Sequence, residues 1–152
     1  MAGADRSTHC RFTKEVVLSP GFSMTPTSGT FTTNGQNGSI ECDGLVAGHQ
    51  PIGSGSIGTE GRYGTDGADT CTSGTEGTGF DTLTIPTAEG PRTLIAAYRF
   101  TAGEPPKKGD GVIAGRFGGD RFTGTFEAMP LKGDCLTSPV TALRVVGEGV
   151  LH

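Results

Sequence analysis

Glycine and proline interrupt this chain so often that there is little room in it for helices. The 152 residues include 27 glycines and 9 prolines, and only two substantial windows, 4–19 and 92–102, contain neither. Globular helices usually run for ~10–14 residues, and both residue types destabilise a helix interior. The chain is therefore expected to fold from short extended segments that are joined by tight turns.

The composition is poor in large apolar side chains for a folded domain. Leu, Ile, Val and Phe total 30 residues, about a fifth of the chain and close to the level at which disorder sets in. The formal net charge is only −4, however, and the polar excess is mostly glycine and threonine. Thr suits strands and Gly suits turns and bulges, so these features indicate a folded β domain.

Alternation of apolar and polar residues predicts eight or nine short strands. In the segment 11–18, for example, Phe12, Val16 and Leu18 share one face. The other predicted strands cover 29–33, 39–46, 53–63, 80–85, 92–100, 112–117, 121–129 and 140–151.

The dipeptide Asn34-Gly35 separates two of these predicted strands. Both of its residues tolerate positive φ, which makes Asn-Gly the strongest short-range signal of a hairpin. We therefore expect 29–33 and 39–46 to pair with each other.

The short connections and the lack of βαβ spacing predict an all-β fold, an antiparallel up-and-down β-barrel of about eight strands. A β-sandwich is the alternative. Glycines within the predicted strands favour the barrel, because they relieve sharp coiling and mark bulges. We expect one barrel domain, 10–152, after a flexible N-terminal segment, 1–9. The strand glycines are Gly44, Gly53, Gly55, Gly115, Gly124, Gly147 and Gly149.

The four cysteines, Cys10, Cys42, Cys71 and Cys135, are spread over most of the chain. Their even number and wide spacing predict two disulfides, and hence a secreted or periplasmic protein. The segment 1–5 lacks the features of a signal peptide, so this interpretation presumes a leader outside the present sequence. Four free thiols in a cytoplasmic protein are the alternative. Of the three connectivities, we favour Cys42–Cys71 with Cys10–Cys135.

Charge and hydropathy argue against several classes of partner. A pI near 5.3 with dispersed charge disfavours nucleic acid. No apolar run approaches the ~18–20 residues of a membrane span. Cysteine and histidine do not occur in the close pairs of zinc sites, so we expect no metal and no cofactor. The sequence does not indicate an oligomeric state.

A few polar groups could carry chemistry, but each has a simpler interpretation. His49 is the only histidine away from the termini and so the only plausible imidazole acid or base, although a solvated loop residue explains it as well. Glu41 and Asp43 share one strand face, which we expect to be solvated. The loop 66–69 is acidic but lacks the residue order of an EF-hand.

The stretches 53–63 and 119–126 resemble the strand–glycine–strand texture of small eight-stranded barrels. The allene-oxide-cyclase and dirigent superfamily has this texture, as do the lipocalin-like calycins. The likeness covers about half of the chain, and it rests on texture and not on a motif, since the chain has no Trp for the lipocalin Gly-x-Trp signature. The resemblance implies an apolar lumen that binds a hydrophobic small molecule or folds one for cyclisation. It carries over no catalytic residue.

In a barrel of this kind, the polar groups expected near the lumen are Tyr63, Tyr98, Arg99 and Arg116. The candidates for catalysis are Tyr98, Arg116, Tyr63 and His49. A barrel that binds a small molecule offers apolar walls with a few such donors. The predicted ligand-binding residues are Tyr98, Phe100, Arg116, Phe117, Phe122 and Phe126.

The leading functional expectation is a small disulfide-stabilised barrel that binds an apolar small molecule or a partner. One alternative is a cyclase or isomerase whose lumen folds a hydrophobic substrate, which would need few polar groups. Another is a structural or interaction protein whose barrel is filled by side chains. Tyr or Arg donors buried in a dry lumen would favour the enzyme.

Overall fold

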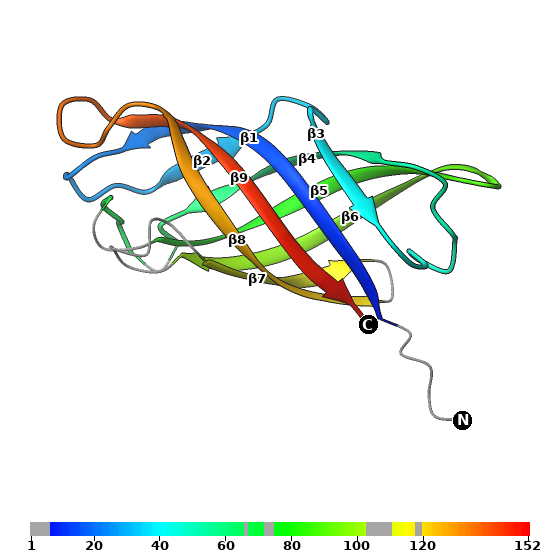
Figure 1. Ribbon diagram of the computed structural model, residues 1–152. Helices are drawn as coiled ribbons and strands as arrows, with labels where there is room; N and C mark the ends of the chain where they lie inside the picture. The colour runs from blue at the N-terminus through cyan, green and yellow to red at the C-terminus, as the bar shows by residue number, and fades with distance from the viewer. Residues whose placement is uncertain (1–6, 66, 72–74, 103–110, 118–119) are drawn as a thin grey trace.

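The computed structural model of the protein describes residues 7–65, 67–71, 75–102, 111–117 and 120–152, and for 75, 102, 111–114, 116 and 117 only the backbone. The described residues form nine strands and no helix (Figure 1). No helix in these ranges is therefore long and apolar enough to cross a membrane. The strands are β1 (Thr8–Phe22), β2 (Gly29–Thr32), β3 (Gly38–Cys42), β4 (Gly55–Tyr63), β5 (Thr75–Thr87), β6 (Gly90–Ala102), β7 (Gly111–Phe117), β8 (Asp120–Lys132) and β9 (Val140–Leu151).

The nine strands belong to one antiparallel sheet that closes on itself. From β3 onwards each strand pairs with the next along the chain, and β9 pairs with β1. That last pairing runs from Thr8 opposite Leu151 to Val17 opposite Ala142. The predicted all-β, antiparallel up-and-down fold is thereby confirmed. The first strand begins at Thr8, two residues before the predicted start of the domain, and residues 1–6 lie outside the described part of the chain.

The predicted hairpin between 29–33 and 39–46 is wrong. β2 and β3 do not pair with each other; both lie between β1 and β4 and run in the same direction. The two short strands thus share one place in the wall, so nine strands occupy eight positions. Asn34 and Gly35 do adopt positive φ, 57° and 116°, but they carry the chain out of the sheet and back into it without reversing its direction.

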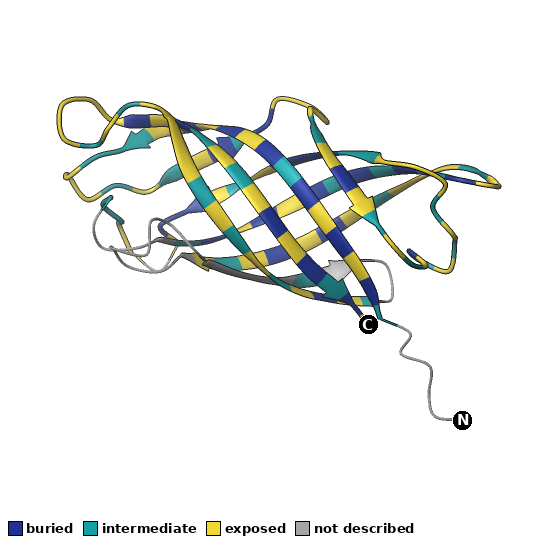
Figure 2. Cartoon of the chain, viewed as in Figure 1, coloured by how far each residue is buried: buried dark blue, intermediate teal, exposed yellow. Residues whose placement is uncertain are grey.

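Side chains alternate between the interior and the solvent along the strands, as the bands in Figure 2 show on β1 and β9. This two-residue period comes from the pleat of the strand. On β1, the inward positions carry buried side chains from Thr8 to Leu18.

Aromatic rings in the interior lie over glycines on neighbouring strands. A Cβ atom built on Gly147 would overlap the ring of Phe12, and one on Gly149 would come within 2.5 Å of Phe122 Cζ. Phe100 covers Gly77 in the same way. Of the glycines predicted inside strands, Gly147 and Gly149 therefore make room for rings, whereas Gly44 and Gly53 lie outside the observed strands.

The four cysteines form two disulfides, as predicted, but with a different connectivity. Cys10 is bonded to Cys42 and Cys71 to Cys135. The error follows from the misplaced hairpin: because β3 pairs directly with β1, Cys42 lies opposite Cys10, with the Cα atoms 4.1 Å apart. The second bond joins the β4–β5 connection to the β8–β9 connection.

Candidate functional site

A buried ion pair crosses the interior of the barrel. Lys14 on β1 and Asp81 on β5 belong to strands that are not neighbours in the sheet, yet Nζ lies 3.0 Å from Oδ1. The two side chains are only 4% and 8% exposed. Removing charges from water is unfavourable unless they are paired, so the fold must hold these two groups together.

Both charged residues occupy inward positions, next to apolar residues of the same strand face. Lys14 stands between Phe12 and Val16 on β1, and Asp81 is followed two residues later by the fully buried Leu83 on β5. Side chains two residues apart on a strand point to the same face. The alternation that turns Phe12 and Leu83 inward therefore turns Lys14 and Asp81 inward as well.

Two aromatic rings flank the ammonium group. Lys14 Nζ lies 4.7 Å from the centroid of the Phe12 ring and 5.1 Å from that of Tyr98. At these distances the ring faces attract the cation. Lys14 donates one of its three N–H groups to Asp81 Oδ1, and the Phe12 and Tyr98 rings lie beside the ammonium without offering it an oxygen.

Thr59 and Tyr98 complete the polar centre, the name used here for Lys14, Asp81, Thr59 and Tyr98. The Tyr98 hydroxyl is 2.6 Å from Thr59 Oγ1, and Thr59 Oγ1 donates to the carbonyl of Phe80 at 3.0 Å. A threonine hydroxyl has one proton, so Tyr98 is the donor to Thr59. Burial, followed by the charge of Asp81, raises the pKa of Tyr98 far above its ordinary value. Tyr98 is therefore a neutral phenol whose proton is already engaged.

Four inward rings gather beside the polar centre and form what we call the aromatic half of the interior: Phe31, Tyr98, Phe100 and Phe126. The Phe100 centroid lies 5.6 Å from that of Phe31, 6.3 Å from Tyr98 and 6.1 Å from Phe126. Phe31 and Tyr98 are buried, whereas Phe100, Phe126 and the neighbouring Val145 pack against the core but keep part of their surface accessible.

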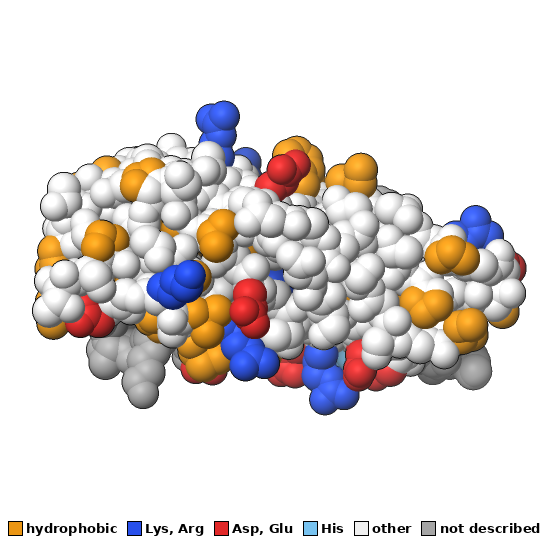
Figure 3. All heavy atoms as spheres, turned by 90° about the horizontal axis from the view of Figure 1, so that it is seen from above, with side chains coloured by type: hydrophobic (Ala, Val, Ile, Leu, Met, Phe, Trp, Pro, Cys, Tyr) orange, Lys and Arg blue, Asp and Glu red, His pale blue; other side chains and the backbone are white. Residues whose placement is uncertain are grey.

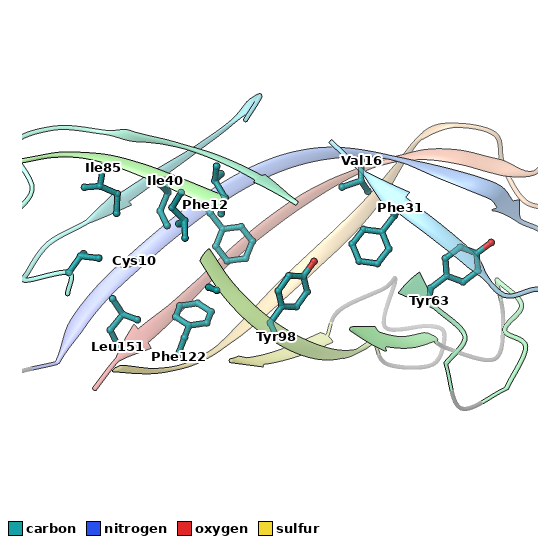
Figure 4. Packing of buried hydrophobic residues seen from close by; sticks show 14 of the residues in the cluster. Cys10, Phe12, Val16, Phe31, Ile40, Tyr63, Ile85, Tyr98, Phe122 and Leu151 are labelled. Atoms are coloured by element: carbon teal, nitrogen blue, oxygen red, sulfur yellow. The ribbon is translucent and has the colours of Figure 1, made fainter. Parts of the chain in front are cut away.

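The other end of the interior is tightly packed, and we call it the closed half. Phe12 and Phe122 meet there with ring centroids 6.5 Å apart. Figure 4 shows these rings, like Phe31 and Tyr98, pointing into the space that the strands enclose. Its most deeply buried apolar side chains, each at most 2% exposed, are Cys10, Ile40, Ile57, Leu83, Ile85 and Leu151.

The structure brings together half of the predicted ligand-binding residues. In the aromatic half, Phe100 contacts both Tyr98 and Phe126. Phe122 lies in the closed half, against Phe12. The side chains of Arg116 and Phe117 lie outside the described residues.

Three of the predicted catalytic residues, Tyr63, Tyr98 and His49, do not form a common site, and the Arg116 side chain lies outside the described residues. The Tyr63 hydroxyl donates to the carbonyl of Pro20, and burial raises the pKa of Tyr63. His49 lies on the β3–β4 connection, where its Nδ1 is 3.0 Å from Oε1 of the exposed Glu89. Neither residue contacts the polar centre, and the proton of Tyr98 is engaged by Thr59.

Sequence reasoning missed Lys14, Asp81 and Thr59, although a signal was present. In the predicted strand 11–18, Lys14 falls on the same face as Phe12 and Val16, where a charge is out of place. Asp81 likewise falls on the face of Leu83. A charged residue on the apolar face of two different strands indicates a buried pair.

Glu41 and Asp43, which share one strand face in the sequence, each interact with a different partner. Glu41 lies 4.0 Å from the exposed Arg11, and Asp43 accepts a hydrogen bond from the His9 amide. Residue 66 of the acidic loop lies outside the described part of the chain. Among the described residues, no three His, Cys, Asp or Glu side chains are grouped so that they could hold a metal ion.

A groove on the outer wall crosses β3, β1, β9 and β8. Three of its side chains are acidic and one is basic, so its lining does not match an apolar ligand. On the face seen in Figure 3, hydrophobic side chains stand singly or in small groups among polar ones. The groove is lined by Arg11, Phe12, Thr13, Ser39, Glu41, Thr125, Phe126, Glu127, Val146, Gly147 and Glu148.

Comparisons of the chain with protein-family models, with curated proteins and with solved structures find no match. The resemblance to allene-oxide-cyclase-like and calycin-like barrels therefore stays a prediction.

Proposed function

We propose that the protein binds an apolar small molecule in the aromatic half of the barrel and works in an oxidising compartment outside the cytoplasm. The observation that carries the proposal is the accessible surface of Phe100 and Val145, which pack against the core from inward positions. Side chains in a fully packed interior lose such surface, as Leu83 and Ile57 do. The two disulfides support the choice of compartment.

The chemistry of the aromatic half suits an apolar ligand. Ligand sites are lined mainly by hydrophobic and aromatic side chains, with a few polar groups that orient the ligand. Phe31, Phe100 and Phe126 supply the rings, and the adjacent polar centre supplies the orienting groups.

Binding has more support than catalysis of a cyclisation. A cyclase of the expected kind would use the tyrosine hydroxyls that were predicted as catalytic groups. Tyr98 donates to Thr59 and Tyr63 donates to Pro20, so neither hydroxyl proton is free. The alternative of a side-chain-filled interaction protein is supported by the closed half only, and the experiment below separates it from binding.

A pair of adjacent valines gives a matched test. Val145 faces the interior opposite Lys14, whereas Val146 is 40% exposed on the outer wall. We expect Val145→Phe to fill the aromatic half and weaken binding of the neutral apolar dye Nile red by at least ~10-fold. Val146→Phe adds the same ring outside and should leave the affinity unchanged.

Fluorescence titration of both variants with Nile red checks this, and native mass spectrometry of the protein purified from an oxidising host checks for a retained ligand. A wild-type protein that neither binds the dye nor carries added mass would support the filled barrel instead. Equal weakening by both substitutions would place the dye on the outer surface and overturn the assigned site.

A further inference from the structure

We infer that the ligand of the aromatic half carries a neutral carbonyl oxygen, as in a ketone, ester or amide, which accepts a hydrogen bond from the Lys14 ammonium. This inference rests on the proposed function, because it concerns the chemistry of the molecule that occupies the same site.

The first step is the incomplete hydrogen bonding of Lys14. An ammonium group has three N–H donors, and Asp81 Oδ1 is its one acceptor among the described residues. Phe12 and Tyr98 attract its charge through their ring faces, at 4.7 and 5.1 Å, but are not oxygen acceptors. The side chain is 4% exposed, so a further acceptor reaches the ammonium only when neighbouring side chains move aside.

The two hydroxyl groups of the polar centre have no proton left to donate to a ligand. Thr59 gives its only proton to Phe80, and Tyr98 gives its proton to Thr59. Within the described part of the chain, Lys14 is therefore the group of the polar centre with donors to spare.

The charge of Asp81 favours a neutral ligand group over an anionic one. Asp81 already neutralises Lys14 at 3.0 Å. A ligand carboxylate would add an uncompensated negative charge beside Asp81 in a low-dielectric interior, where like charges repel strongly. A neutral carbonyl adds a charge-assisted hydrogen bond and no net charge.

The fourth step places the donor next to the accessible surface. Val145 lies opposite Lys14 in the β1–β9 pairing. The Tyr98 ring lies against the Lys14 ammonium on one side and near Phe100 on the other. A ligand that contacts Phe100 and Val145 can therefore direct one polar end to Lys14.

Three ligands of equal chain length test the inference: 2-undecanone, undecanoate and undecane, each measured by displacement of Nile red. We expect the ketone to bind ~10- to 100-fold more tightly than the alkane, as for one hydrogen bond to a charged group. The carboxylate should bind more weakly than the ketone.

The double variant Lys14→Met with Asp81→Leu is the control. It removes the pair as a unit and leaves no unpaired buried charge, whereas either single change would strand one. In this variant we expect the ketone and the alkane to bind equally. Should the double variant fail to fold, the order of the three ligands on the wild-type protein decides.

The outcomes separate the two proposals. If none of the three ligands displaces the dye and the protein carries no ligand, the proposed function fails and the inference fails with it. If all three bind alike, or the double variant keeps the preference for the ketone, the role of Lys14 is overturned while the binding function stands. Tightest binding of undecanoate would overturn the neutral carbonyl and identify an acid.

Discussion

Single residues decide how the interior of this barrel is filled, and glycine is the most informative of them. Inward glycines leave space that rings on the neighbouring strand occupy, as Gly147 does for Phe12 and Gly77 for Phe100. The chain can therefore pack its interior with few large apolar residues, because each ring fills its own inward position and the space beside the neighbouring glycine.

Gly147→Ala tests this packing directly. The added methyl group would overlap the Phe12 ring, whose Cε1 atom lies 2.8 Å from the new Cβ position. We expect the free energy of unfolding to fall by about 1–3 kcal/mol, which urea denaturation measures. Gly53→Ala is the matched control, since its Cβ would meet only Pro86 Cγ at 3.9 Å.

A second substitution distinguishes crowding from an effect on the backbone. In a Phe12→Leu background the same Gly147→Ala change should lose much of its effect, because the ring that it overlaps is gone. An unchanged effect in that background would show that the alanine acts through the strand itself.

At the scale of elements, local turn chemistry acts independently of strand pairing. The connection between β8 and β9 is held by Asp134, whose carboxylate accepts hydrogen bonds from the Thr137 hydroxyl and from the amides of Thr137 and Ser138. This arrangement is an Asx-type turn within the connection that also carries Cys135. Asn34 and Gly35 likewise adopt the conformation expected of Asn-Gly, but outside a hairpin.

The Asp134 turn predicts a pH dependence. The hydrogen bonds, first that of the Thr137 hydroxyl, lower the pKa of Asp134 from 3.8 to about 2. A lowered pKa in the folded state means that the stabilisation is present above about pH 4 and is lost as the pH falls through about 2. NMR titration should find the Asp134 carboxyl ionised at pH 3.

Asp134→Asn should remove this part of the acid sensitivity, because an amide does not titrate. Thr137→Val, which deletes the principal donor, should bring the pKa of Asp134 back towards its ordinary value. A carboxyl that titrates near 4 in the wild-type protein would contradict the assigned hydrogen bonds.

At the scale of the whole molecule, the two disulfides bind separate parts of the closed sheet. Cys10–Cys42 joins β1 and β3 within the wall, and Cys71–Cys135 joins two connections. The bonded cysteines are 32 and 64 residues apart in the sequence. For loops of these lengths, the loss of chain entropy in the unfolded state predicts that each bond stabilises the folded protein by about 4 kcal/mol.

Removal of either bond should therefore lower the free energy of unfolding by about 2–5 kcal/mol. We expect Cys10→Ala with Cys42→Ala to be the more harmful pair, because Cys10 is 1% exposed and its loss also leaves a cavity. Urea denaturation without reductant measures both. If reductant lowers the free energy of unfolding of the wild-type protein by more than the sum of the two Cys→Ala pairs, the two disulfides do not act independently.

Several features could be predicted from the sequence because they depend on local patterns. Glycine and proline exclude helices, and alternation places strands such as 140–151 and 112–117 within a few residues of those observed. The side of the strand on which Tyr98 and Phe100 lie follows from the same alternation. The oxidised state of the cysteines follows from their number and spacing.

Only the tertiary structure decided which distant segments meet. β3 pairs with β1 and not with β2, which sets the partner of Cys42, and Lys14 meets Asp81 across 67 residues of sequence. The period of a strand tells which face a residue occupies but not which strand lies opposite. The closure of the sheet supplies that register, and with it the ion pair and the aromatic half of the interior.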